Sequence, residues 1–92
     1  MEGFEWDEGK AELNWRLHEV LFTDAAEVFD DPCRLNDPDY YEGEDRWRTV
    51  GMVRGEVLLA VVYTITDEGK IRFISARHVE PYERRRYGNR KF

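Results

Sequence analysis

Four residues near the end of the sequence have side chains that could bind or cleave a phosphodiester: Arg77, His78, Glu83 and Tyr87. The planar guanidinium of arginine matches phosphate oxygens, so we expect Arg77 to stabilise the charge that develops on a cleaved phosphate. Histidine is the residue type best suited to exchange a proton near neutral pH, so His78 is a candidate acid or base. Glu83 is a candidate base. Tyr87, four residues on along the same helix face, could donate a proton or stack on a nucleobase.

Each of these residues also has a structural interpretation. Arg77 could form a salt bridge with a loop acid, and Glu83 could pair with an arginine that only stabilises its helix. His78 could be a surface histidine. Neighbouring residues of a strand point to opposite sides, so Arg77 and His78 can share a site only if the strand ends and twists there.

The four residues lie in the most basic stretch of the chain, from Ile71 to Phe92. This stretch holds seven Lys or Arg and two Glu, although the whole chain has a net charge of −6. We interpret it as a site for a polyanion, most simply RNA. The further arginines that we expect to contact RNA are Arg46, Arg48, Arg72, Arg84 and Arg85.

The acidic residues gather at the other end of the sequence. Residues 1–45 carry 15 acids and three bases, whereas residues 46–92 carry five acids and 11 bases. Two solvated faces of opposite sign would explain this split. The functional interpretation is that the two halves serve different partners, with the acidic half discouraging non-specific binding of nucleic acid.

The composition argues against several other classes of protein. The two histidines and the single cysteine lack metal-ligand spacing, and the chain has no glycine-rich phosphate loop, so we predict neither a metal site nor a cofactor. No apolar run approaches the ~20 residues of a membrane span. The acidic N-terminus is unlike a signal peptide. Because Cys33 cannot form an internal disulfide, we expect a cytoplasmic protein.

Hydrophobic periodicity predicts one small α+β domain, residues 1–92, in the order strand, helix, helix, three strands, helix. The first strand spans residues 3–7. The helices span 8–19, capped by Asp7, and 24–29, capped by Thr23. Residues 33–45 are mostly loop, with a possible short strand at Arg34-Leu35. Strands follow at 46–53, 56–66 and 71–78, joined by tight turns and therefore antiparallel. The last helix begins at Pro81 and ends at Gly88.

This order places the two N-terminal helices on one face of an antiparallel sheet. The other face is only partly covered by the short basic C-terminal helix. Ala11, Trp15 and His18 share one stripe of the first helix, and His18 is expected to pack there. A partly open, basic sheet face is a plausible surface for RNA.

Several sequence motifs resemble the BrnT family of toxins. The N-terminal part of the resemblance is Phe4–Asp7, Lys10, Ala11, Asn14, His18, Val20, Phe22 and Ala25–Pro32. The later part is Arg46–Gly51, Val57–Thr64, Ile74–Arg77 and Glu83–Tyr87. These motifs cover nearly the whole chain in the right order.

The resemblance implies a RelE-like fold and a ribonuclease toxin of a type II toxin–antitoxin system, which cuts mRNA without a metal and blocks translation. It also implies neutralisation by a BrnA-like antitoxin with a ribbon-helix-helix domain, so that DNA would be contacted only through the antitoxin. Residues 78–82 depart from the family pattern. The alternative is therefore a weakly active or inactive module that binds the antitoxin or acts as a corepressor.

Overall fold

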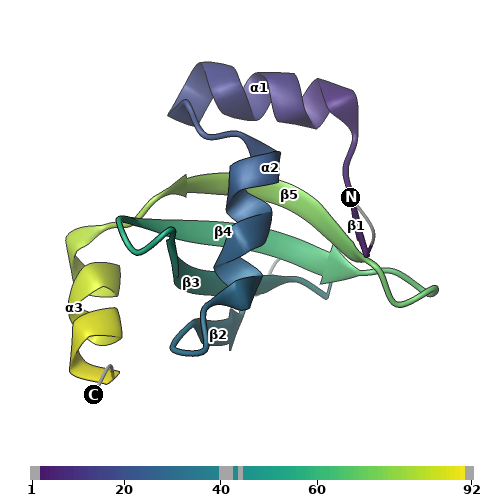
Figure 1. Cartoon of the computed structure of the whole chain (residues 1–92). Helices are drawn as coiled ribbons and strands as arrows, with labels where there is room; N and C mark the ends of the chain where they lie inside the picture. The colour runs from purple at the N-terminus through teal and green to yellow at the C-terminus, as the bar shows by residue number, and fades with distance from the viewer. Residues whose placement is uncertain (1–2, 40–42, 44, 91–92) are drawn as a thin grey trace.

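A five-stranded sheet forms the centre of the computed structural model, which describes residues 3–39, 43 and 45–90. The strands lie in the order β1-β5-β4-β3-β2 (Figure 1). Their bounds are β1 Phe4–Glu5, β2 Leu35–Pro38, β3 Trp47–Val53, β4 Val57–Ile65 and β5 Ile71–His78. The predicted antiparallel run of three strands is confirmed as β3, β4 and β5. Tight turns join these strands, and such turns allow only antiparallel neighbours.

The prediction of a fully antiparallel sheet was wrong at one edge. Strand β1 lies parallel to β5, with Phe4 beside Ile71 and Glu5 beside Arg72. Parallel neighbours need a long connection, and here most of the chain, including two helices, separates the two strands. The fold is therefore α+β with a mixed sheet.

The described chain has one strand more than predicted. Strand β2 pairs antiparallel with β3 over four residues, from Leu35 opposite Val50 to Pro38 opposite Trp47. The Thr49 hydroxyl also donates to the Leu35 carbonyl at 3.0 Å. Proline is tolerated because β2 is an edge strand, where a missing N–H need not break a hydrogen-bond ladder. The segment expected to be mostly loop thus carries polar side chains onto the sheet.

Two N-terminal helices cover one face and one edge of the sheet (Figure 1). Helix α1 spans Glu8–His18, and the Asp7 carboxylate caps it as predicted by accepting from the Gly9 amide. Helix α2 spans Phe22–Ala25 and continues as the 3-10 helix η1, Ala26–Asp30. The predicted cap at Thr23 was wrong, because α2 already begins at Phe22. Phe73 of β5 is fully buried beneath these elements, in contact with several aromatic rings: Phe4, Trp6, Phe22 and Phe29.

Asn14 fixes α1 to the sheet. Its amide donates to the Ala76 and Val20 carbonyls at 2.8 and 3.0 Å, and its carbonyl accepts from the Ala76 amide at 2.9 Å. The side chain thus fills both hydrogen-bonding sites on the outer edge of β5 at Ala76. The expected inward stripe was wrong at Trp15, which is 47 % exposed, whereas Asn14 is 4 % exposed.

Helix α3, Pro81–Arg90, packs against the other face near the ends of β3, β4 and β5 (Figure 1). Pro81 occupies its first position as predicted, but the helix continues past Gly88. Tyr87 is buried here in a second small core, whose other members are Leu35, Val50, Leu58 and Ala60. No helix in the described part of the chain is long and apolar enough to span a bilayer. Since α3 is short, it leaves part of this face to polar side chains.

Candidate functional site

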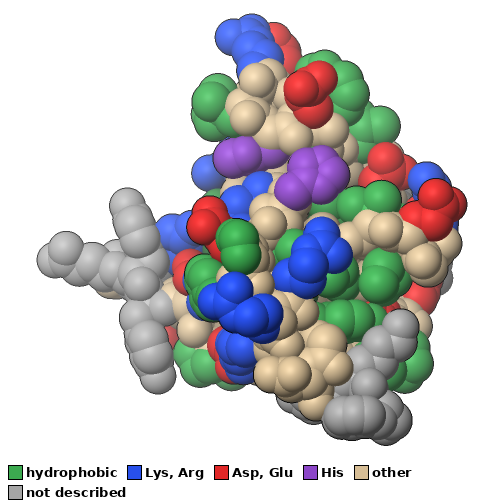
Figure 2. Space-filling model, turned by 90° about the vertical axis from the view of Figure 1, so that its left-hand side faces the viewer, with side chains coloured by type: hydrophobic (Ala, Val, Ile, Leu, Met, Phe, Trp, Pro, Cys, Tyr) green, Lys and Arg blue, Asp and Glu red, His purple; other side chains and the backbone are tan. Residues whose placement is uncertain are grey.

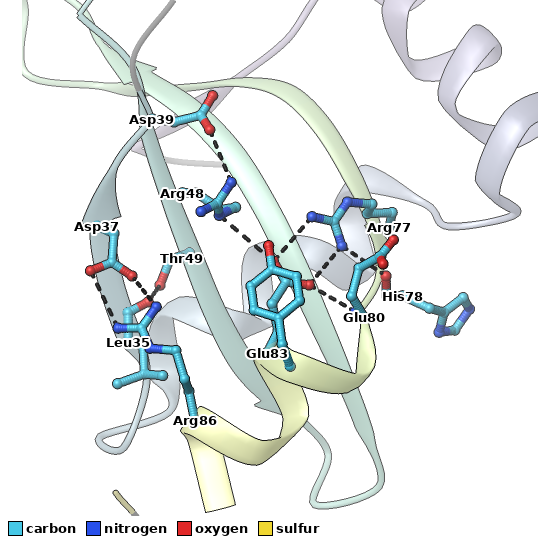
Figure 3. Close-up of polar contacts among 11 residues, drawn as sticks. Leu35, Asp37, Asp39, Arg48, Thr49, Arg77, His78, Glu80, Glu83 and Arg86 are labelled. Atoms are coloured by element: carbon cyan, nitrogen blue, oxygen red, sulfur yellow. Dashed lines mark hydrogen bonds and ion pairs between the residues drawn. The ribbon is translucent and has the colours of Figure 1, made fainter.

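The buried carboxylate of Glu83 is the centre of a polar cluster between α3 and the sheet (Figure 3). Arg77 donates from Nη1 to Oε1 at 2.8 Å and from Nη2 to Oε2 at 3.0 Å. The Glu80 amide donates to Oε1 at 2.8 Å. Arg48 adds a second guanidinium, with Nε 3.7 Å from Oε2. Two arginines from different strands thus converge on one carboxylate.

The sheet register explains this convergence. Arg48 lies opposite Val62, and Arg77 lies opposite Ala60, two residues further back along β4. Residues two apart on a strand face the same side, so both arginines project from the face that α3 partly covers. Glu83 lies in the first turn of α3 and points down onto this face (Figure 3).

The cluster holds Glu83 in its ionised form. Burial raises the pKa of the Glu83 carboxyl, but the Arg77 hydrogen bonds, the Glu80 amide and the charges of Arg77 and Arg48 together lower it below its usual range. The hydrogen bonds with Glu83 raise the pKa of the Arg77 guanidinium. Such a carboxylate is a weak base, so its geometry suits holding Arg77 in place better than accepting a proton.

Acidic residues at the end of β2 extend the network. The Asp39 carboxylate accepts from Arg48 Nη1 at 3.1 Å and lies 3.9 Å from Arg46 Nε. Asp37 accepts from Arg86 of α3 at 2.9 Å (Figure 3). The sequence pattern places these acids in a loop and gives no clear sign of β2, so it does not single them out as site residues. Arg86 was also missed, since α3 carries three successive arginines that the sequence alone cannot distinguish.

His78 does not join the cluster. It is the last residue of β5, and its ring points away from Glu83 (Figure 3), on the strand side opposite to Arg77. Only its backbone takes part, because its carbonyl accepts from Arg77 Nη1 at 3.1 Å. The strand does not twist enough to bring both side chains to one side.

Tyr87 also lies apart from the cluster. It shares a helix face with Glu83, as predicted, but its hydroxyl donates to the Asp31 carboxylate at 2.6 Å. Burial raises the pKa of Tyr87 above its usual range, and Asp31 raises it further. The hydroxyl is therefore protonated at neutral pH and directed to Asp31. The catalytic roles predicted for Tyr87 and His78 remain predictions.

The other predicted RNA contacts fall in two places. Arg72 lies at the opposite end of β5 from Arg77, where it pairs with Glu5 at 3.2 Å. Arg84 and Arg85 are exposed on α3. Figure 2 shows Lys and Arg side chains gathered below the two histidines of the chain, with Asp and Glu side chains among them. Lys91, which we counted in the basic stretch, lies outside the described residues.

In the part of the chain that the structure describes, no three His, Cys, Asp or Glu side chains gather as metal ligands would. The prediction of cleavage without a metal is not tested by this finding. The chemistry that the site offers is the binding of an anion by arginines whose orientation is fixed by carboxylates.

The fold and this site define a small α+β protein in which two strand arginines meet one buried carboxylate. Residues 6–83 match the family model described as "Ribonuclease toxin, BrnT, of type II toxin-antitoxin system". The chain belongs to this family.

A solved structure has the same fold. It is the 1.1 Å crystal structure of the Brucella abortus ribonuclease toxin BrnT, which aligns with a TM-score of 0.68 and 22 % sequence identity. The alignment covers 84 % of this chain and 95 % of that chain. No curated protein matches the chain significantly. The family match and the shared fold confirm the resemblance drawn from the sequence motifs.

Proposed function

We propose that this chain is an endoribonuclease toxin that cuts mRNA in the cytoplasm without a metal and so blocks translation. The observation that carries the proposal is the convergence of Arg48 and Arg77 on Glu83, on a sheet face flanked by the exposed arginines of α3. Membership of a ribonuclease toxin family supports it. A RelE-like architecture is part of the same proposal.

Arg77 has the donors to hold a phosphate while Glu83 fixes its orientation. A guanidinium has five N–H donors. Two of the N–H groups of Arg77 donate to the Glu83 carboxylate, and a third donates to the His78 carbonyl. The Nε–H and one Nη2–H are left without a partner among the described residues. These two donors share one edge of the guanidinium, a geometry that matches two oxygens of one phosphate.

RNA cleavage of this kind needs three functions. A base takes the proton of the 2′-hydroxyl, which attacks the adjacent phosphate, an acid protonates the leaving 5′-oxygen, and cations stabilise the charge on the phosphorane. We assign the cation to Arg77, assisted by Arg48, and we assign to Glu83 the positioning of Arg77. His78, the next residue along the strand, could transfer a proton there only if its ring turned round the end of β5 to the side of Arg77. Tyr87 could take part only if its hydroxyl left Asp31.

A second function is favoured by one observation. The guanidiniums of Arg48, Arg77 and Arg86 are each already paired with a carboxylate, so the site is largely neutralised within the chain. In this alternative the protein has lost catalysis and acts as an antitoxin-binding or corepressor module. In both functions the antitoxin is a BrnA-like ribbon-helix-helix protein, and DNA is contacted only through it.

Incubation of the purified chain with a defined RNA in EDTA tests the proposal. We expect cleavage, with a 2′,3′-cyclic phosphate on one fragment and a 5′-hydroxyl on the other. His78→Ala tests proton transfer: a loss of about 10²-fold would require the ring to turn to the side of Arg77, and an unchanged rate would remove His78 from the mechanism. Intact RNA in EDTA, together with unimpaired growth of cells that express the chain without its antitoxin, would favour the second function.

A further inference from the structure

A second surface of the molecule has the features of a protein-docking site. It is a hollow of about 160 Å³ between the end of β5 and the turn that joins β3 to β4. Its apolar lining is Val20, Val53, Val57 and Leu59, and its charged and polar rim is Glu19, Asp24, Arg54 and His78. An apolar cavity of ~150 Å³ is large enough to hold benzene, so this hollow can hold one aromatic or branched aliphatic side chain.

The hollow opens to solvent through one of its apolar side chains. Val57 is 39 % exposed, whereas Val20, Val53 and Leu59 are each 5 % exposed or less. A partner side chain could therefore contact Val57 directly and cover the edges of the other three. Apolar surface that lines a hollow and is rimmed by polar residues marks interaction sites.

Glu19, an acidic residue of the rim, has a backbone conformation that is unfavourable for any residue except glycine. Glu19 ends α1 with φ 55°, in the left-handed region where glycine is favoured and other residues are strained. Asp24 on the same rim is already paired with Arg54 at 3.0 Å, so Glu19 is the rim carboxylate that has no ion pair among the described residues. The surface therefore suits a partner segment that presents an apolar side chain next to a basic one.

The hollow adjoins the arginine site through β5. His78 contributes to its rim, and the His78 carbonyl accepts from Arg77 Nη1 at 3.1 Å. A partner seated in the hollow would therefore lie beside the residue that we assign to phosphate binding. It would be on the strand side opposite to Glu83, so it need not enter the arginine cluster itself.

We propose that this hollow receives an apolar side chain of the antitoxin, with a neighbouring Lys or Arg of the antitoxin facing Glu19. The proposal rests on the toxin function proposed above, because that function supplies the partner.

Matched charge substitutions at the two ends of β4 test the apolar contact. Val57 lines the hollow, whereas Ile65, at the far end of the strand, is 58 % exposed and distant from it. We expect Val57→Lys to weaken the affinity for the BrnA-like antitoxin by at least about 10-fold, as substitutions at the centre of an interface do. Ile65→Lys should leave the affinity within about 2-fold, as substitution outside an interface does. Titration calorimetry with the full-length chain gives both values, and circular dichroism checks that each variant is folded.

Substitutions of Glu19 separate binding from folding. Glu19→Gly removes both the carboxylate and the backbone strain, so we expect a folding constant about 2-fold to 5-fold higher and a weaker antitoxin affinity. Glu19→Ala removes the carboxylate and keeps the strain, so it should weaken binding without raising stability.

Three outcomes would overturn the inference: unchanged affinity of Val57→Lys, equal loss in Val57→Lys and Ile65→Lys, or a homodimer of the free chain that Val57→Lys dissociates. The last outcome would assign the hollow to a second copy of this chain. RNA cleavage by the parent chain is measured separately. An inactive parent that still binds antitoxin through Val57 would contradict the proposed function and leave this docking surface in place.

Discussion

Replacing Glu83 by glutamine tests whether the buried carboxylate organises the arginine cluster. The substitution keeps the shape of the side chain and removes its charge, so Arg77 and Arg48 lose their shared counter-ion. Breaking a fully buried ion pair costs about 3–5 kcal/mol. The Arg77 and Arg48 side chains are 29 % and 27 % exposed, so water compensates part of this loss. We therefore expect the free energy of unfolding to fall by about 2–3 kcal/mol at pH 7, typical of a charged hydrogen-bonded pair.

The pH dependence of the same variant gives a sharper test. The pKa of Glu83 is lower in the folded protein than in the unfolded chain, where it is about 4.3. Its stabilising effect is therefore complete above that pH and is lost as the pH falls through the folded pKa. The difference in unfolding free energy between the parent and Glu83→Gln should be constant from about pH 6 to 8 and should shrink below about pH 4.3.

Urea unfolding followed by circular dichroism measures both quantities. Glu80→Gln is the matched control, because Glu80 is exposed and contributes its backbone amide to the cluster. It should change the free energy of unfolding by less than about 0.5 kcal/mol, as surface substitutions do. A loss in Glu83→Gln that is equally small, or that stays constant down to pH 3, would refute the reasoning.

Three further substitutions test other parts of the structure, each by urea unfolding. Asn14→Ala leaves the Ala76 backbone groups without partners and should cost about 2–4 kcal/mol, since each unsatisfied buried group costs about 1–3 kcal/mol. Gly51→Ala should cost about 1–3 kcal/mol, because a Cβ at this position would lie 2.8 Å from Val28 Cγ1. Tyr87→Phe should cost about 1–2 kcal/mol and leave RNA cleavage within about 3-fold, because its hydroxyl donates away from the arginine cluster.

The sequence predicted the elements whose pattern is local. Strands β3, β4 and β5 have apolar runs bounded by turn residues, and their predicted bounds lie within one residue of those observed. The start of α3 at Pro81 was also predicted from a local signal, because proline fits the first position of a helix. The pairing of Arg77 with Glu83 was not predicted, although the two residues are only six apart in the chain, because a loop acid was the expected partner of Arg77.

The features that the sequence did not predict depend on contacts across the fold. Strand β2 exists because β3 offers it a free edge, which its own polar residues do not reveal. Tyr87 was assigned to the site from its spacing to Glu83, yet its partner Asp31 lies 56 residues away in sequence. The inward side of α1 is set by Asn14, whose hydrogen bonds to Ala76 span 62 residues. Hydrophobic periodicity indicates that one side of a helix or strand is buried, but it does not identify the residues of other elements that this side contacts.

Single-turnover RNA cleavage by two arginine variants tests the central claim most directly. Arg77 and Arg72 lie on the same strand, and each is paired with a glutamate, but only Arg77 belongs to the cluster on Glu83. We predict that Arg77→Ala slows cleavage in EDTA by about 10²–10³-fold, as removal of one donor to a developing negative charge does. Arg72→Ala, outside the cluster, should remain within about 3-fold by the same reasoning. Equal rates for the two variants would contradict the claim that Arg77 stabilises the scissile phosphate.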